Sequence, residues 1–132
     1  MGPSEVAKAF VSRINAHDVS GLCGLMTEDH AFVDALEGRV TGRAAMQAGW
    51  QQYFQMIPDY WIRIDTVLEK GGVIALFGAA GGSYSKGEAG SAAAKWQIPA
   101  AWLAEVRGES VATWRVYADN LPLRQLMALE PR

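Results

Sequence analysis

The sequence has 132 residues, of which 50% are apolar and 20% charged, and this composition is typical of one globular domain with a single core. The net charge is -2 and the Lys and Arg residues are scattered, so no basic face for nucleic acid is apparent. The apolar stretch from Val73 to Ala80 is too short to span a membrane, and the single Cys23 has no disulfide partner within the chain. We expect one domain over residues 1–132, in the cytoplasm, with no nucleic acid and no membrane as partner.

The first part of the chain predicts helices. A first helix follows Ser4, a candidate N-cap, and apolar residues such as Phe10 and Ile14 recur in it at a four-residue spacing. A second, shorter helix follows, and either Asp18 or Ser20 can cap it. Both helices should pack an apolar stripe against the rest of the domain.

A short strand and a third helix come next. Residues 30–34 are too few and too rich in Phe and Val for a helix, so they predict a strand. Helical spacing of apolar residues returns from Arg43 to Ile57, and Pro58 then ends the helix. About three helices therefore precede the later part of the chain.

That later part predicts strands. β-branched and aromatic residues are enriched in four successive segments, which are residues 60–68, 73–84, 96–106 and 110–118. Short connections with glycine favour antiparallel pairing, and Gly78, Gly81 and Gly82 allow one strand to bend sharply. Residues 121–127 can form a last short helix or a closing flap. Helices followed by strands indicate the α+β class with a strongly curved antiparallel sheet.

The connection from Ser85 to Lys95 has almost no side chain suited to burial. One interpretation is an ordinary surface loop. The other is a mobile segment that covers the mouth of a pocket. The sequence alone leaves both open.

Five tryptophans are many for a chain of this length. Together with the Phe and Tyr residues they predict either a large core or an aromatic cavity. Trp96 and Trp102 share one parity of their strand, so both can face the same side of the sheet. The same holds for Trp114, Val116 and Ala118 on the last strand.

Few polar residues indicate chemistry. Asp34 follows Ala-Phe-Val at the end of a predicted strand, where a carboxylate beside an apolar pocket can act as a general base. The alternative is a solvated Asp that favours a turn. We interpret His17 and His30 as solvated or capping residues. Because no His, Cys or carboxylate spacing indicates a metal and no glycine pattern indicates a nucleotide, we expect neither a metal nor a cofactor.

Four stretches form a pattern, namely N-A-H-D at 15–18, L-M-T-E-D at 25–29, F-V-D at 32–34 and W-R-V-Y-A-D at 114–119. With them the chain resembles, almost from end to end, the SnoaL-like branch of the nuclear transport factor 2 superfamily. Its relatives include ketosteroid isomerases, polyketide cyclases and limonene-type epoxide hydrolases, and also noncatalytic proteins. The resemblance implies a cone-shaped sheet closed by about three N-terminal helices around an apolar pocket, and commonly a homodimer formed through the outer sheet face.

The resemblance places Asp34 where ketosteroid isomerases carry their proton-shuttling aspartate. Phe10 and Trp102, however, stand in place of the two donors that stabilise a dienolate in those enzymes, and Trp50 stands in place of a supporting tyrosine. Losing one such donor costs about 2.7 to 4 kcal/mol of transition-state stabilisation, which argues against the same isomerisation. Val116 replaces the water-activating aspartate of the epoxide hydrolases, so that chemistry is also disfavoured.

We therefore expect a cofactor-independent acid-base enzyme of the cyclase or isomerase type that acts on a hydrophobic polyketide-like or cyclic compound. Asp34 is the expected base, with Asp119 as the alternative. The residues expected to contact the substrate are Phe10, Trp50, Tyr53, Trp102, Trp114 and Val116. The competing hypothesis is a noncatalytic module that binds a hydrophobic ligand or forms a dimer, and the missing donors motivate it.

Overall fold

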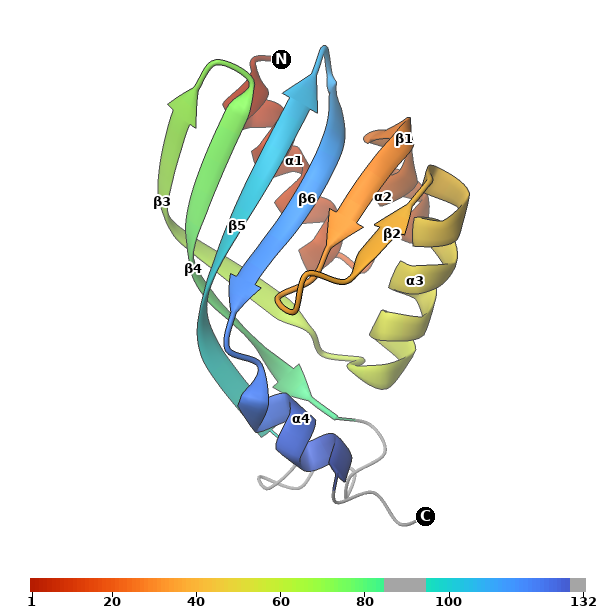
Figure 1. Ribbon diagram of the computed structural model, residues 1–132, viewed down its shortest axis with the longest axis vertical. Coiled ribbons are helices and arrows are strands. Elements are labelled where there is room, and N and C mark those ends of the chain that lie inside the picture. Colours follow the sequence, from red (N-terminus) through yellow and green to blue (C-terminus); the bar gives the residue numbers. More distant parts are fainter. Residues whose placement is uncertain (85–94, 129–132) are drawn as a thin grey trace.

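A six-stranded sheet forms the frame of the protein, and it curls without closing on itself (Figure 1). The computed structural model describes residues 1–84 and 95–128, so all of the expected connection from Ser85 except Lys95 lies outside the described residues. The elements are α1 (Pro3–Asn15), α2 (Val19–Gly24), β1 (Met26–Val33), β2 (Arg39–Thr41), α3 (Arg43–Met56), β3 (Trp61–Lys70), β4 (Val73–Ser83), β5 (Lys95–Arg107), β6 (Ser110–Ala118) and α4 (Leu121–Ala128). The expected α+β class is confirmed.

The strands follow the order β2-β1-β6-β5-β4-β3. Two-residue turns join β3 to β4 and β5 to β6, and these pairs are antiparallel, as predicted. The pair β1 and β6 is parallel, which the expectation of a purely antiparallel sheet did not include. These two strands are far apart in sequence, so no hairpin dictates their relative direction.

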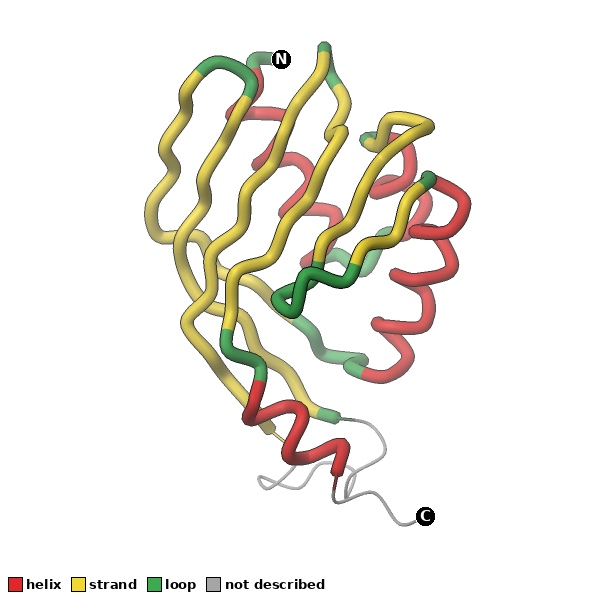
Figure 2. The backbone as a smooth tube through the Cα atoms, in the orientation of Figure 1, coloured by secondary structure: helices red, strands yellow, loops and turns green. Residues whose placement is uncertain are grey.

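The sheet bends within the antiparallel pair of β3 and β4. A Cβ atom at Gly78 would collide with the backbone carbonyl of Arg63 on β3, so only glycine allows this close approach. The register of the same pair shifts between Ile64 and Thr66, which marks a β-bulge. Figure 2 shows β3, β4 and β5 curving toward the end of the molecule where α4 lies. The curvature predicted from the glycines is therefore confirmed.

Helix α1 packs across the concave face of the sheet, against β3, β4, β5 and β6. Its buried residues are Val6, Ala7, Phe10 and Ile14. The helix begins at Pro3 with Gly2 as its N-cap, because proline suits the first helical position, where no intrahelical N–H bond is lost. Ser4, the predicted cap, instead donates a hydrogen bond to Glu69 on β3. Asp18 caps α2, as one of the two predicted alternatives.

The first two strands differ from the expectation. Strand β1 begins at Met26, earlier than the strand predicted at residues 30–34, because Met26 pairs with Val111 on β6. Strand β2 was not predicted, since its three residues are all exposed and show no alternation. It forms because β1 supplies a partner for its backbone groups.

His30 is buried, and the prediction that it is solvated or capping was wrong. Its side chain is 0% exposed, and its Nδ1 lies 2.7 Å from the carbonyl oxygen of Val111. His17 is half-buried, with its ring stacked on Phe54 and its Nε2 2.7 Å from the carbonyl oxygen of Tyr60. The sequence pattern missed these contacts because both partners come from distant segments.

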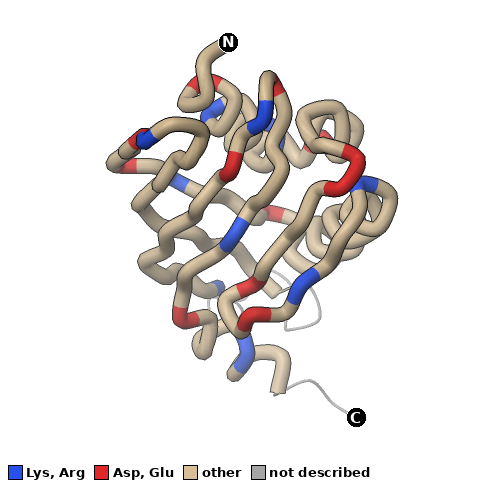
Figure 3. Tube along the Cα trace, turned by 45° about the horizontal axis from the view of Figure 1, so that its top comes forward, with Lys and Arg blue, Asp and Glu red and all other residues tan. Residues whose placement is uncertain are grey.

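Charged residues are distributed over several elements. Figure 3 shows Lys and Arg interspersed with Asp and Glu along the chain. Several oppositely charged residues meet at the surface, such as Arg107 with Asp29 and Arg115 with Glu37. Among the described helices, none is long and apolar enough to cross a membrane.

Candidate functional site

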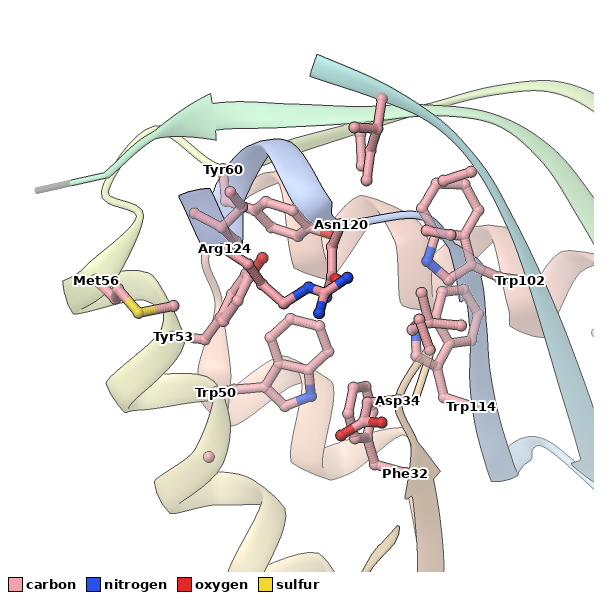
Figure 4. Close-up of a pocket in the computed structure, with 18 of the residues that line it drawn as sticks. Phe32, Asp34, Trp50, Tyr53, Met56, Tyr60, Trp102, Trp114, Asn120 and Arg124 are labelled. Carbon is pink, nitrogen blue, oxygen red and sulfur yellow. The ribbon is translucent and has the colours of Figure 1, made fainter. Parts of the chain in front are cut away.

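A cavity of about 420 Å³ lies between the concave side of the sheet, α3 and α4. Its wall is mainly aromatic and aliphatic (Figure 4). Side chains reach it from the end of β1 and from α3, β5, β6 and α4. Such a space is of the size that holds a small organic molecule.

Aromatic rings in mutual contact form one part of the wall. The ring centroids of Phe32 and Trp50 lie 6.2 Å apart, and those of Trp50 and Tyr53 also lie 6.2 Å apart, with edge-to-face geometry in both pairs. Tyr53 and Tyr60 continue the series at 4.9 Å, again edge to face. Each ring is held by its neighbours, so this wall keeps its shape without a ligand.

The sheet contributes the opposite part of the wall. The even-numbered residues of β5 point inward because side chains alternate along a strand. On β6, Trp114 and Val116 face the same way, and the rings of Trp114 and Trp102 stack with centroids 6.3 Å apart. The structure thus brings five of the six expected substrate-contact residues into the lining, namely Trp50, Tyr53, Trp102, Trp114 and Val116.

Phe10 is the sixth, and the structure places it outside the lining. It is fully buried on α1, with its ring 4.8 Å from that of Trp114 and 6.0 Å from that of His30. Phe32, at the end of β1, lines the cavity. Phe10 therefore supports the ring of Trp114 from within the core.

Asp34 lies at the edge of the cavity, just after β1 (Figure 4). Its Oδ1 accepts hydrogen bonds from the backbone N–H groups of Leu36 and Gly38, each 2.8 Å long. The backbone N–H of Asp34 donates to the carbonyl oxygen of Gly38. No hydrogen bond within the described residues involves Oδ2. One carboxylate oxygen thus fixes the turn between β1 and β2, and the other is available.

Asp119, the alternative acid-base residue, does not line the cavity. Its Oδ1 accepts a hydrogen bond of 3.0 Å from the N–H of Leu121 at the start of α4. The same oxygen is 4.0 Å from Nη2 of Arg124, and the side chain is 80% exposed. Its contacts are those of a helix cap.

The cavity also contains polar residues that the sequence reasoning did not single out. Asn120 and Arg124 reach it from the C-terminal end of the chain, and Tyr60 reaches it from the segment between α3 and β3. Asn120 directly precedes the segment 121–127, for which a helix was one of two expectations, and its four-residue spacing from Arg124 was the signal that could have placed both on one side.

Burial raises the pKa of the Tyr53 phenol and, more strongly, that of Tyr60, where the neighbouring Tyr53 adds to the effect. Both hydroxyl groups therefore stay protonated and can donate hydrogen bonds. The indole nitrogen of Trp50 is buried and has no acceptor among the described residues. In residues 1–84 and 95–128, no group of three or more His, Cys, Asp or Glu residues could hold a metal ion. The site is therefore rich in donors and has one carboxylate at its edge.

The curled, unclosed sheet and the helices that cover its concave side define a nuclear transport factor 2-like fold. Within this fold class, the family model described as SnoaL-like domain matches residues 7–119, so the chain belongs to the SnoaL-like domain family. No curated protein matches the chain.

Solved structures with the same fold include three informative examples. A hypothetical protein from Catenulispora acidiphila, with a ketosteroid isomerase-like fold and in complex with trimethylamine, is 20% identical, with 95% of this chain and 93% of that chain covered and a TM-score of 0.81. A candidate SnoaL-like polyketide cyclase from Shewanella denitrificans is 14% identical, with 96% of both chains covered and a TM-score of 0.82. IdmH from Streptomyces antibioticus, a candidate polyketide cyclase, is 16% identical, with 98% and 100% covered and a TM-score of 0.78. At these identities the likeness shows the fold.

Proposed function

We propose that this protein binds a small hydrophobic compound in the cavity and acts on it by acid-base catalysis, with Asp34 as the base. The observation that carries the proposal is that Asp34 is the one Asp or Glu among the described residues that line the cavity. The substrate class is a polyketide-like or other cyclic compound with an acidic C–H group beside a carbonyl. The reaction is a cyclase or isomerase step that needs no cofactor.

The local geometry supports this role. The two backbone N–H groups that bind Oδ1 hold the carboxylate in one orientation, so that Oδ2 remains free to accept a proton. The indole N–H of Trp50 and the protonated phenols of Tyr53 and Tyr60 are donors in the same cavity. Such donors can stabilise the oxyanion that forms when a proton leaves the carbon next to a carbonyl group.

A noncatalytic binding module is the alternative function. The turn bonds of Asp34 favour it, because a purely structural carboxylate at a strand end makes the same bonds. Under this alternative the cavity holds its ligand without proton transfer. The two functions therefore differ in whether Asp34 exchanges a proton with the bound molecule.

Proton exchange on a small ketone tests the proposal directly. 2-Tetralone fits the size of the cavity, and its α-protons exchange with deuterium when a base removes them. We expect the wild-type protein to accelerate this exchange in D₂O above the buffer rate, measured by proton NMR. We expect Asp34→Asn to lose at least about 100-fold of that acceleration, because general-base catalysis contributes roughly 10²–10⁴-fold.

Asp119→Asn is the matched control, since it makes the same change at a carboxylate outside the cavity. It should retain the exchange activity. Binding of 2-tetralone, followed by tryptophan fluorescence, should survive in both variants. Wild-type exchange no faster than buffer, with binding intact, would leave the binding module as the function, and loss of exchange only in Asp119→Asn would transfer the role to that residue.

We further propose that the protein is a homodimer formed through the outer face of the sheet. Phe77 and Tyr117 are 43% and 51% exposed, although both lie in central strands. Each pairs in register with Ala101 of β5, so the two rings flank the same small residue. An apolar strip of this kind is typical of a surface covered by a partner.

The single Cys23 is compatible with the cytoplasm as the site of action.

A further inference from the structure

Arg124 is the one Lys or Arg among the described residues that line the cavity. Figure 4 shows its guanidinium directed from α4 into the space between Tyr53, Tyr60 and Trp102. The Arg124 side chain is 47% exposed, so water hydrates part of the guanidinium while the rest borders a largely apolar wall. A cation in this position attracts an anionic group of a ligand that enters the cavity.

Within the described residues, no carboxylate of the protein forms a close ion pair with Arg124. The nearest ion pair joins Nη2 of Arg124 to Oδ1 of Asp119 at 4.0 Å, at the limit of an ion pair, and Asp119 is 80% exposed. Such a pair contributes little, because water screens it. No ion pair joins Arg124 to Asp34 among the described residues, although both line the cavity.

The position of Arg124 is fixed by the packing of α4. Leu123, its neighbour, is 5% exposed and belongs to the hydrophobic core, so it anchors the helix against the sheet. The backbone N–H of Arg124 donates to the carbonyl oxygen of Asn120, 3.0 Å away, in the first turn of the helix. These contacts place the backbone of Arg124 beside the cavity, which its side chain lines.

Other unsatisfied donors surround the same space. The Trp50 side chain is 5% exposed, and its indole nitrogen has no acceptor in the described part of the chain. Trp96, which also lines the cavity, is 7% exposed, and its indole nitrogen likewise has no acceptor among the described residues. A buried donor without an acceptor is destabilising, so the site favours a ligand that supplies oxygen acceptors.

We propose that the ligand is a hydrophobic acid whose anionic oxygen, a carboxylate or an acidic enol or phenol, pairs with Arg124. The proposal rests on the proposed ligand-binding function of the cavity and adds the chemical class of the ligand. Because Asp34 repels an anion and Arg124 attracts it, the two charges also set the orientation. The acidic end of the ligand faces α4, and its hydrocarbon end faces β1.

A matched pair of probes separates charge from shape. 2-Naphthoate and 2-naphthamide have nearly the same size, and only the first is an anion at neutral pH. We expect the wild-type protein to bind 2-naphthoate about 10-fold more tightly than 2-naphthamide, measured by isothermal titration calorimetry, as a charge-assisted hydrogen bond in a half-exposed setting would provide.

The variant Arg124→Gln should remove this preference by weakening 2-naphthoate binding about 10-fold, with 2-naphthamide binding unchanged. Arg124→Lys should retain part of the preference, because it keeps the charge and loses the planar fork. Arg63→Gln is the matched control, since Arg63 lies on the outer part of β3, pairs with Asp65 and does not line the cavity. It should leave both affinities as in the wild type.

The outcomes separate this inference from the function on which it rests. Binding of 2-naphthamide as tight as that of 2-naphthoate, or an equal loss of both in Arg124→Gln, overturns the ligand class and leaves the binding function intact. Failure of both probes to bind the wild-type protein overturns ligand binding in the cavity, and the inference with it.

Discussion

His30 has a defined tautomer in the interior of the protein. Its Nδ1 lies 2.7 Å from the carbonyl oxygen of Val111, and a carbonyl can only accept, so Nδ1 carries the proton. Nε2 is buried without a partner among the described residues. Burial lowers the pKa of His30, and the Val111 carbonyl and the nearby Asp29 offset this in part. The folded protein therefore keeps His30 neutral to a lower pH than the unfolded chain does.

This predicts a loss of stability in acid. Above the ordinary pKa of 6.5, His30 is neutral in both the folded and the unfolded chain, so it adds no pH dependence. As the pH falls below that value, the unfolded chain takes up a proton that the folded chain does not bind, and the free energy of unfolding decreases until the lower folded pKa is reached. Urea unfolding between about pH 7.5 and about pH 5.5 should reveal this decrease.

His30→Gln should flatten this dependence, because glutamine can keep the hydrogen bond to Val111 and does not titrate. Proton NMR of the wild-type protein should show the His30 ring titrating below its ordinary pKa of 6.5. A ring that titrates above this value would contradict the assignment.

The bend of β4 against β3 depends on the absence of a side chain at Gly78. Alanine there would place its Cβ against the backbone carbonyl of Arg63, which cannot move without breaking the strand pairing. We expect Gly78→Ala to lower the free energy of unfolding by on the order of 2 kcal/mol, as overpacking does. Urea unfolding provides the measurement.

Gly24→Ala is the matched control at the end of α2. A Cβ atom at Gly24 meets nothing within 4 Å, and Gly24 is helical, so alanine should be neutral or stabilising there. Equal effects of the two substitutions would show that the curvature does not depend on close approach at Gly78.

The two faces of the sheet have different surroundings. The concave face packs against helices and lines the cavity. The outer face presents exposed apolar side chains from several strands, which are Leu68, Val73, Phe77 and Tyr117. We proposed that a second copy of the chain covers this face.

The dimer is tested by placing a charge at its expected centre. We expect the wild-type protein to have the mass of a dimer in size-exclusion chromatography with light scattering, and Phe77→Lys to shift it to a monomer, because a buried unpaired charge opposes association. Ser12→Lys is the control, since Ser12 is exposed on α1, which covers the opposite, concave face of the sheet. A wild-type monomer at every concentration tested would refute the proposal.

Much of the fold could be predicted because its signals are local. The four-residue spacing in α1, the proline that follows α3 and the glycine turns of the hairpins each depend on a few neighbouring residues. The start of β1 and the existence of β2 could not be predicted in this way. Met26, at the start of β1, pairs with Val111, which is distant in the sequence. Strand β2 is held by its pairing with β1, and its own three residues show no alternation.

Some features of the candidate site could also be predicted from local patterns, and others could not. Strand parity alone groups Trp96 with Trp102 and Trp114 with Val116, because alternation is a property of the strand itself. No such rule shows that Phe10 on α1 is packed in the core while Phe32 on β1 lines the cavity. That difference depends on where α1 meets the sheet.

The α+β class, the bent strand and the aromatic character of the interior could be read from the amino-acid sequence, since they follow from spacing, glycine content and composition. The tertiary structure was needed to show that a cavity remains, that Asp34 holds a turn at its edge and that Arg124 lines it. A cavity and its charged groups arise from the packing of elements that lie far apart in the chain. No local pattern encodes those distances.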